Sequence, residues 1–247
     1  ISGMLIIGSS IGLVISLWSK LREVAYFPAL LFLLATAAIH GAGLYTLKKW
    51  KLRSTSRGLL AIAGLLIPLN YLAAIALSEQ RPITDPYYLA SVAVGSLAFA
   101  AMVWSGGRTL LLRGTWPYVI ALWGTSTSQL VIARQVVPHL PTARLYAIVG
   151  IPLACYFVSL IMQLRQTMSW SHLTRRRIAQ IFIVLGAATF ALLTTLGLVV
   201  WKSQDIAGIA ADLSPLLNLA LIPALGLGLV IHRRATSPSL AKLHTAG

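Results

Sequence analysis

Polar side chains at the middle of long apolar runs are the residues of this sequence that could do chemistry. Five of them are consecutive, from Thr125 to Gln129, at the centre of an apolar run over residues 116–137. Neighbouring residues of an α-helix are 100° apart, so five of them cover the whole circumference, and this helix should lie centrally in a bundle. Thr125, Ser128 and Gln129 share one face through their spacing of three and four residues.

Two further amides, Asn70 and Asn218, are expected at the depth of Gln129, each roughly 3 Å outward of the middle of its helix. The candidate intramembrane polar cluster therefore comprises Asn70, Thr125, Ser128, Gln129 and Asn218. One interpretation is a small polar cavity or solute site near Pro68 and Pro215. The other is hydrogen bonding between helices, worth about 0.6 kcal/mol per pair, which needs no ligand.

Ionisable groups are scarce within the apolar runs. Arg134 and Asp212 each lie about one turn inside the expected outer boundary and form a candidate ion pair, or snorkel separately towards water. His40 is the only histidine inside a run, and a membrane haem needs two axial ligands that face one another. Cys155 is the single cysteine, so no disulfide forms within the chain. We therefore expect no catalytic, cofactor-binding or metal-binding residues.

The composition determines the class of protein. Of the 247 residues, 57% are hydrophobic and only 10% are charged, which excludes disordered, water-soluble and disulfide-rich secreted proteins. Unbroken apolar runs of about twenty residues exclude a β-barrel, whose strands alternate apolar and polar residues. The sequence predicts an all-α, polytopic membrane protein.

Eight segments are long enough to cross a bilayer and form one helical bundle through short connections. The expected helices cover residues 1–17, 27–47, 59–77, 87–104, 116–137, 145–164, 178–201 and 209–231, and a basic tail covers 232–247. The chain begins at Ile1 within an apolar run, so we expect further chain upstream.

The net charge of +15 would indicate nucleic acid for a soluble protein, but here its distribution reports orientation. The connections after the second, fourth and sixth helices, with the tail, carry fourteen basic residues and no acid, whereas the other side carries six basic residues and all five acids. Both ends are therefore predicted to be cytoplasmic, in a bacterial inner membrane, without nucleic acid as a partner. Anionic lipid is expected near Lys48, Lys49, Lys51, Arg53, Arg175, Arg176 and Arg177.

The stretch from Ile6 to Ala74 has a helix ending in Trp18, a run from Pro28, a basic turn from Lys48 to Arg57, and a second apolar run from Gly58. This pattern resembles bacterial predicted membrane proteins of a domain-of-unknown-function type. Members of such families are often long polytopic proteins or membrane portions of larger ones. The resemblance implies no activity and no site residues.

These observations favour a membrane-embedded scaffold, sensor or accessory portion of a larger protein or complex, together with other membrane subunits. A passive channel or carrier for a small neutral solute is the first alternative, and it requires Asn70, Gln129 and Asn218 to line one cavity. A structural subunit of a pigment or electron-transfer complex is the second. An intramembrane enzyme acting on lipid would need His40, or Arg134 with Asp212, at a lateral opening.

Overall fold

The computed structural model describes residues 27–78, 86–111, 115–136, 141–169 and 175–203, and in the last part of the chain 211, 213–215, 218, 222 and 224–230. The expected first helix, over residues 1–17, and the basic tail lie outside these residues. Every regular element in the described ranges is a helix. The all-α prediction is therefore confirmed.

The helices follow one another with short connections. In chain order they are α2 (Phe27–Lys49), α3 (Arg53–Ser78), α4 (Pro86–Leu110), α5 (Trp116–Val119), the π-helix η1 (Ile120–Gly124), α6 (Thr125–Gln135), α7 (Thr142–Met168) and α8 (Arg175–Ser203). Helices α2, α3, α4, α7 and α8 each include an expected segment and extend beyond it at one or both ends. Helices α5, η1 and α6 together cover residues 116–135 of the expected 116–137. Parts of the expected eighth helix are also helical, including residues 224–230.

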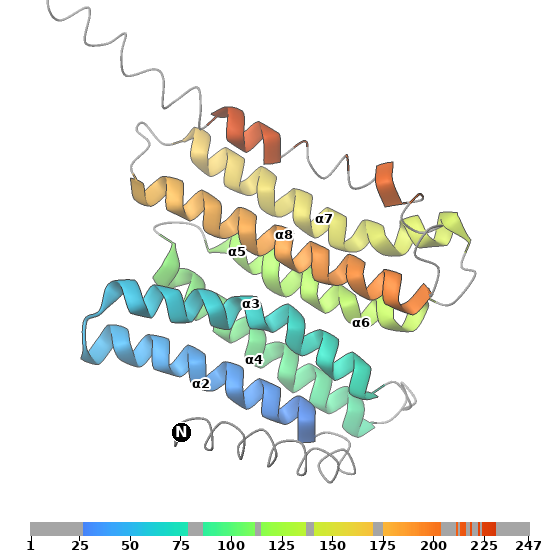
Figure 1. Ribbon diagram of the computed structural model, residues 1–247, viewed down its shortest axis with the longest axis horizontal. Helices are drawn as coiled ribbons and strands as arrows, with labels where there is room; N and C mark the ends of the chain where they lie inside the picture. The colour runs from blue at the N-terminus through green and yellow to red at the C-terminus, as the bar shows by residue number, and fades with distance from the viewer. Residues whose placement is uncertain are drawn as a thin grey trace, which may run out of the picture.

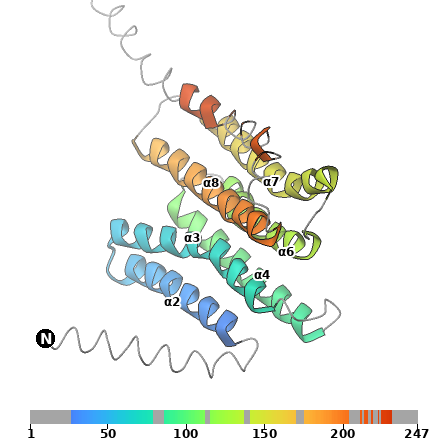
Figure 2. The same cartoon turned by 45° about the vertical axis from the view of Figure 1, so that its right-hand side comes forward.

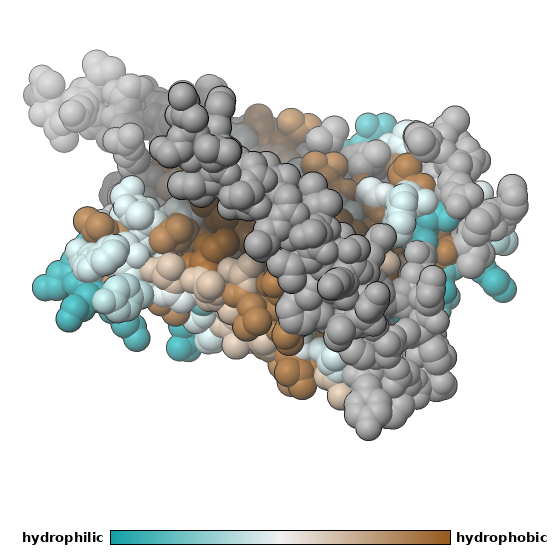
Figure 3. All heavy atoms as spheres, turned by 60° about the horizontal axis from the view of Figure 1, so that its bottom comes forward, coloured by the Kyte–Doolittle hydropathy of each residue, from teal (hydrophilic) through white to brown (hydrophobic). Residues whose placement is uncertain are grey.

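Within the described residues, five helices are long and apolar enough to cross a membrane: Leu30–Lys49, Arg53–Ala76, Leu89–Leu110, Thr142–Met168 and Arg177–Ser203. Large apolar side chains remain exposed along them, such as Val94 and Leu97 of α4 at 66% and 68%. Figure 3 shows hydrophobic residues over the middle of one face and hydrophilic residues towards its two ends. This is the surface of a membrane protein, because only lipid tails solvate such an apolar belt.

Successive long helices alternate in direction, as Figures 1 and 2 show. The C-terminal ends of α2, α4 and α7 therefore lie at one end of the bundle, with the N-terminal ends of α3, α5 and α8. The turn from α2 to α3 is tight: Lys51 adopts a left-handed conformation with φ 55°, and the Ser56 hydroxyl donates to the Gly43 carbonyl at 2.8 Å.

The described residues form two apolar cores in the bundle. One joins α6, α7 and α8 through residues such as Ile132, Leu160 and Ile181. The other joins α3 and α4 to α5, η1 and α8 through residues such as Ile67 and Leu122. Helix α8 and the continuous segment 116–135 contribute to both cores, so they position the interior polar groups described next.

Candidate functional site in the bundle interior

The segment from α5 to α6 is one continuous helix that contains a π-helical turn. The boundary residues Ile120 and Thr125 keep helical angles, with φ/ψ of −63°/−42° and −66°/−39°. The backbone N–H of Thr125 donates to the carbonyl of Ile120, which is the five-residue spacing of a π-helix. Such turns are rare and occur frequently at functional sites.

This helix is central, as the polar run predicted. It contacts α3, α4, α7 and α8. Two close approaches flank the π-helical turn: a Cβ added at Gly64 of α3 would lie 3.2 Å from Leu122 Cδ1, and one added at Gly124 would lie 3.3 Å from Cys155 Sγ of α7. Both glycines let their helices approach the neighbouring helix more closely than a larger residue would.

The polar run after the π-helical turn satisfies only part of its own hydrogen bonding. Thr127 Oγ1 donates to the carbonyl of Trp123 or of Gly124, each at 2.9 Å, and Ser128 Oγ donates to the carbonyl of Thr125 at 2.6 Å. These bonds use backbone carbonyls three or four residues back, a common arrangement for hydroxyls in membrane helices. They leave the neighbouring polar side chains to find partners elsewhere.

Three buried oxygen atoms of this helix have no hydrogen-bond partner among the described residues: Thr125 Oγ1, Ser126 Oγ and Gln129 Oε1. All three side chains have an exposed fraction of 0%. Buried polar atoms normally have partners, so each unpartnered one calls for an explanation such as a bound water or solute. Ser126 was not among the candidate residues from the sequence.

The amide of Gln129 joins α6 to α8. Its Nε2 donates to Thr195 Oγ1 at 3.2 Å and to Thr194 Oγ1 at 3.3 Å. The hydroxyl of Thr195 in turn donates to the carbonyl of Ala191 at 2.7 Å. Gln129 is thus a hydrogen-bonded contact between two helices, with its carbonyl oxygen still available.

The other two candidate amides have different surroundings. Asn70 is buried, and its Nδ2 donates to Thr36 Oγ1 of α2 at 2.6 Å and to the carbonyl of Leu66 at 2.9 Å. The side chain of Asn218 is exposed. The hydrogen bonds of Asn70 and Gln129 thus connect separate helix pairs, α2 with α3 and α6 with α8. The described contacts do not bring the three amides together.

A network that the sequence did not suggest joins α3, α4 and η1. The hydroxyl of Tyr71 donates to Ser96 Oγ at 2.9 Å, and Trp123 Nε1 donates to the Ser96 carbonyl at 3.0 Å. The deep position of Trp123 was the available signal, because a buried indole N–H requires an acceptor.

His40 connects α2 to α4. Its Nε2 lies 2.9 Å from Ser105 Oγ, and that hydroxyl donates to the carbonyl of Ala101 at 2.8 Å. The tautomer of His40 sets which of the two side chains donates in this pair. His40 therefore joins two helices through a hydrogen bond.

A row of buried polar side chains on α7 was also not predicted from the sequence. Ser159, Gln163 and Thr167 are four residues apart and have exposed fractions of 0%. Ser159 Oγ donates to the carbonyl of Pro117 at 2.8 Å, whereas Nε2 and Oε1 of Gln163 have no partner among the described residues. The four-residue spacing of polar side chains in an apolar helix was the signal that could have found this row.

The remaining candidates are resolved only in part. Arg134 is half-buried at the end of α6, but Asp212 lies outside the described residues, so the expected ion pair stays a prediction. The described residues contain no group of three His, Cys, Asp or Glu side chains that could hold a metal ion.

The chain was compared with models of protein families, with curated proteins and with solved structures, and none of the three comparisons gave a match.

Proposed function

We propose that this protein is a membrane-embedded scaffold, sensor or accessory portion of a larger protein or complex in a bacterial cytoplasmic membrane. One observation carries the proposal: side-chain hydrogen bonds fasten the helices of the bundle to one another. They join α2 to α3, α2 to α4, α3 to α4, α4 to η1, α5 to α7 and α6 to α8. Interior polar groups used in this way favour a fixed arrangement, which suits a scaffold.

The proposed arrangement has eight membrane helices, with the described helix 116–135 as one of them. Its 20 residues would span about 30 Å at the rise of an α-helix. The basic end of the bundle, from which Lys49 and Arg53 project, is proposed to face the cytoplasm together with both chain ends. Anionic lipid would then contact the basic connections, and other membrane subunits would pack on the apolar belt.

The test is native mass spectrometry, with an absorbance scan, on protein purified gently from its own membranes. The proposal expects partner subunits in a fixed ratio. The same chain expressed alone in a foreign membrane is the control and should lack those subunits. A bare chain that carries only lipid from its own membranes would contradict the accessory role, and bound pigment would assign the protein to a pigment or electron-transfer complex.

A second candidate function is a passive carrier or channel for a small neutral solute, with a site on α6 in place of the expected cavity lined by Asn70, Gln129 and Asn218. The unpartnered Thr125 Oγ1, Ser126 Oγ and Gln129 Oε1 support it, because a solute with O–H or N–H donors would satisfy the oxygen atoms of one helix turn. Stopped-flow swelling of proteoliposomes with glycerol or urea tests it. Gln129→Leu should abolish faster swelling, and Asn218→Leu, at an exposed position, should not. Swelling of wild-type proteoliposomes at the rate of empty liposomes would exclude the candidate.

A further inference from the structure

The basic end of the bundle carries an arginine, Arg108, that stacks on an aromatic ring. The guanidinium carbon of Arg108 lies 4.9 Å from the ring centroid of Trp104, four residues earlier on α4. The ring of Trp104 packs edge-on against Trp116 at the start of α5, with centroids 5.0 Å apart and planes at 65°. The guanidinium thus stacks on the ring of Trp104, and Trp116 supports that ring from the side.

The backbone beneath Arg108 is fixed as well. A Cβ added at Gly106 would lie 3.3 Å from His40 Cε1 of α2, and one added at Gly107 would lie 3.2 Å from Thr115 Cγ2 and Tyr118 Cδ1. These two buried glycines let the end of α4 fit tightly between α2 and α5. The position of Arg108 is therefore determined by packing on both sides of its helix.

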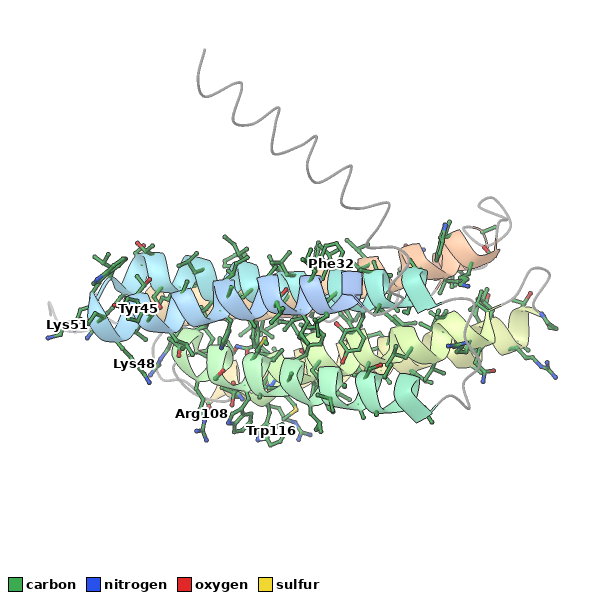
Figure 4. The ribbon with its side chains drawn as sticks, turned by 90° about the horizontal axis from the view of Figure 1, so that it is seen from below. Phe32, Tyr45, Lys48, Lys51, Arg108 and Trp116 are labelled. Atoms are coloured by element: carbon green, nitrogen blue, oxygen red, sulfur yellow. The ribbon has the colours of Figure 1, made fainter. Side chains whose placement is uncertain are left out.

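Other basic side chains lie in the same half of the bundle as Arg108. Figure 4 shows Lys48, Lys51, Arg108 and Trp116 in this half, with Lys51 nearest its tip. The side chain of Arg108 is exposed, and no carboxylate of the described residues faces it, because all five acids of the chain lie outside those residues. Trp116, 55% exposed, and half-buried Trp104 give this site an apolar side next to the cation.

We propose that Arg108, positioned by Trp104 and Trp116, binds the phosphate group of an anionic phospholipid. A guanidinium with free donors forms paired hydrogen bonds to phosphate oxygens, and stacking on an aromatic ring orients those donors in advance. The indole rings contact the glycerol and upper acyl chain of the same lipid, as tryptophan does at membrane interfaces. The source of the phosphate is thus a lipid headgroup rather than the free ion. The inference rests on the proposal that this end meets an anionic leaflet.

The experiment is a native mass spectrometry titration of the detergent-solubilised full chain with dioleoyl phosphatidylglycerol or dioleoyl phosphatidylcholine. We expect phosphatidylglycerol to bind more tightly than phosphatidylcholine. Arg108→Gln should weaken that binding about tenfold, and Trp104→Leu should weaken it about threefold. Lys202→Gln is the matched control. Lys202 also lies over a tryptophan, with its Nζ 5.5 Å from the ring centroid of Trp201, but it lies at the C-terminal end of α8, at the other end of the bundle from Arg108. It should stay within about twofold of the wild type.

Several results would overturn the site. They are equal affinity for the two lipids, an Arg108→Gln variant that binds phosphatidylglycerol like the wild type, or an equal loss in Lys202→Gln. Displacement of the lipid by excess inorganic phosphate would show that the site takes the free ion. The titration in detergent measures lipid affinity and does not depend on the orientation of the protein in a membrane. A loss of the lipid site is therefore distinguishable from an error in the proposed topology. Arg108 is exposed, so its variant should fold, which an unchanged melting temperature would verify.

Discussion

Gln129 on α6 and Thr195 on α8 are joined by a hydrogen bond of 3.2 Å, although 66 residues separate them in the chain. Both side chains have an exposed fraction of 0%. The pair therefore fixes the rotation of the two helices that the apolar cores share, as well as their distance. A carbonyl oxygen of Gln129 without a described partner remains beside this contact.

A double-mutant cycle of Gln129→Leu and Thr195→Val should give a coupling free energy of about 0.6 kcal/mol, the mean for hydrogen bonds between membrane helices. Thr194 offers a second acceptor at 3.3 Å, which keeps the coupling small. The measurement is the free energy of unfolding in mixed detergent micelles. A parallel cycle with Leu193→Val, at an exposed position of the same helix, should give no coupling. A coupling as large in the Leu193 cycle would contradict a specific contact.

Gly64→Ala should destabilise the protein by about 1–3 kcal/mol, the usual cost of an added methyl group in a packed core. The added Cβ would collide with the hydroxyl oxygen of Tyr118 and lie 3.2 Å from Leu122 Cδ1. Thermal unfolding in detergent measures the loss. Gly58→Ala is the control in the same helix, because a Cβ there meets nothing within 4 Å.

Tyr118→Phe tests the cause of that loss. It removes the oxygen that the new methyl group would meet and keeps the buried ring, so Gly64→Ala combined with Tyr118→Phe should recover more than half of the lost stability. No recovery would mean that Leu122 or a backbone shift, rather than the hydroxyl, causes the destabilisation.

The sequence predicted the helices and the central place of 116–135 because length and hydropathy act locally. An apolar run of twenty residues in lipid has to satisfy its backbone within itself, and a helix with polar residues on every side has to be surrounded by protein. The same reasoning gave Asn70 and Gln129 a common depth. The depth of a side chain in the membrane follows from counting residues along its helix. The direction in which it points depends on the neighbouring helices, and here Asn70 meets Thr36 whereas Gln129 meets Thr195.

The features that the sequence did not reveal depend on contacts between distant segments. No residue pattern in the sequence marks the π-helical turn at Ile120–Gly124. The turn contains Leu122, which lies close to Gly64, and Gly124, which lies close to Cys155. The pairing of Tyr71 with Ser96 likewise depends on how α3 meets α4. Gln163 had a visible periodic signal, in phase with Ser159 and Thr167, and a search for buried polar rows would have found it.

Asn70→Leu should lower the free energy of unfolding by about 0.5–1 kcal/mol, because it removes the hydrogen bond to Thr36 from the interior. Asn218→Leu should change it by less than about 0.5 kcal/mol, since that side chain is exposed. Denaturant titration of the two variants side by side makes the comparison. Equal losses would mean that Asn218 has a buried role in the assembled protein and would restore the idea of a shared layer of amides.

The proposed orientation predicts which introduced cysteines are labelled from outside intact cells. Cys155 is the single cysteine of these 247 residues and is half-buried in α7, so Cys155→Ala removes the thiol of this sequence. In that background, Thr142→Cys at the start of α7 should react with a membrane-impermeant maleimide. Ser54→Cys and Ser169→Cys should react only after the membrane is opened, because both lie at the basic end of the bundle. All three positions are exposed, so access to the reagent depends on the side of the membrane. Labelling of Ser54→Cys and Ser169→Cys in intact cells, with Thr142→Cys protected, would reverse the orientation and place the basic end outside.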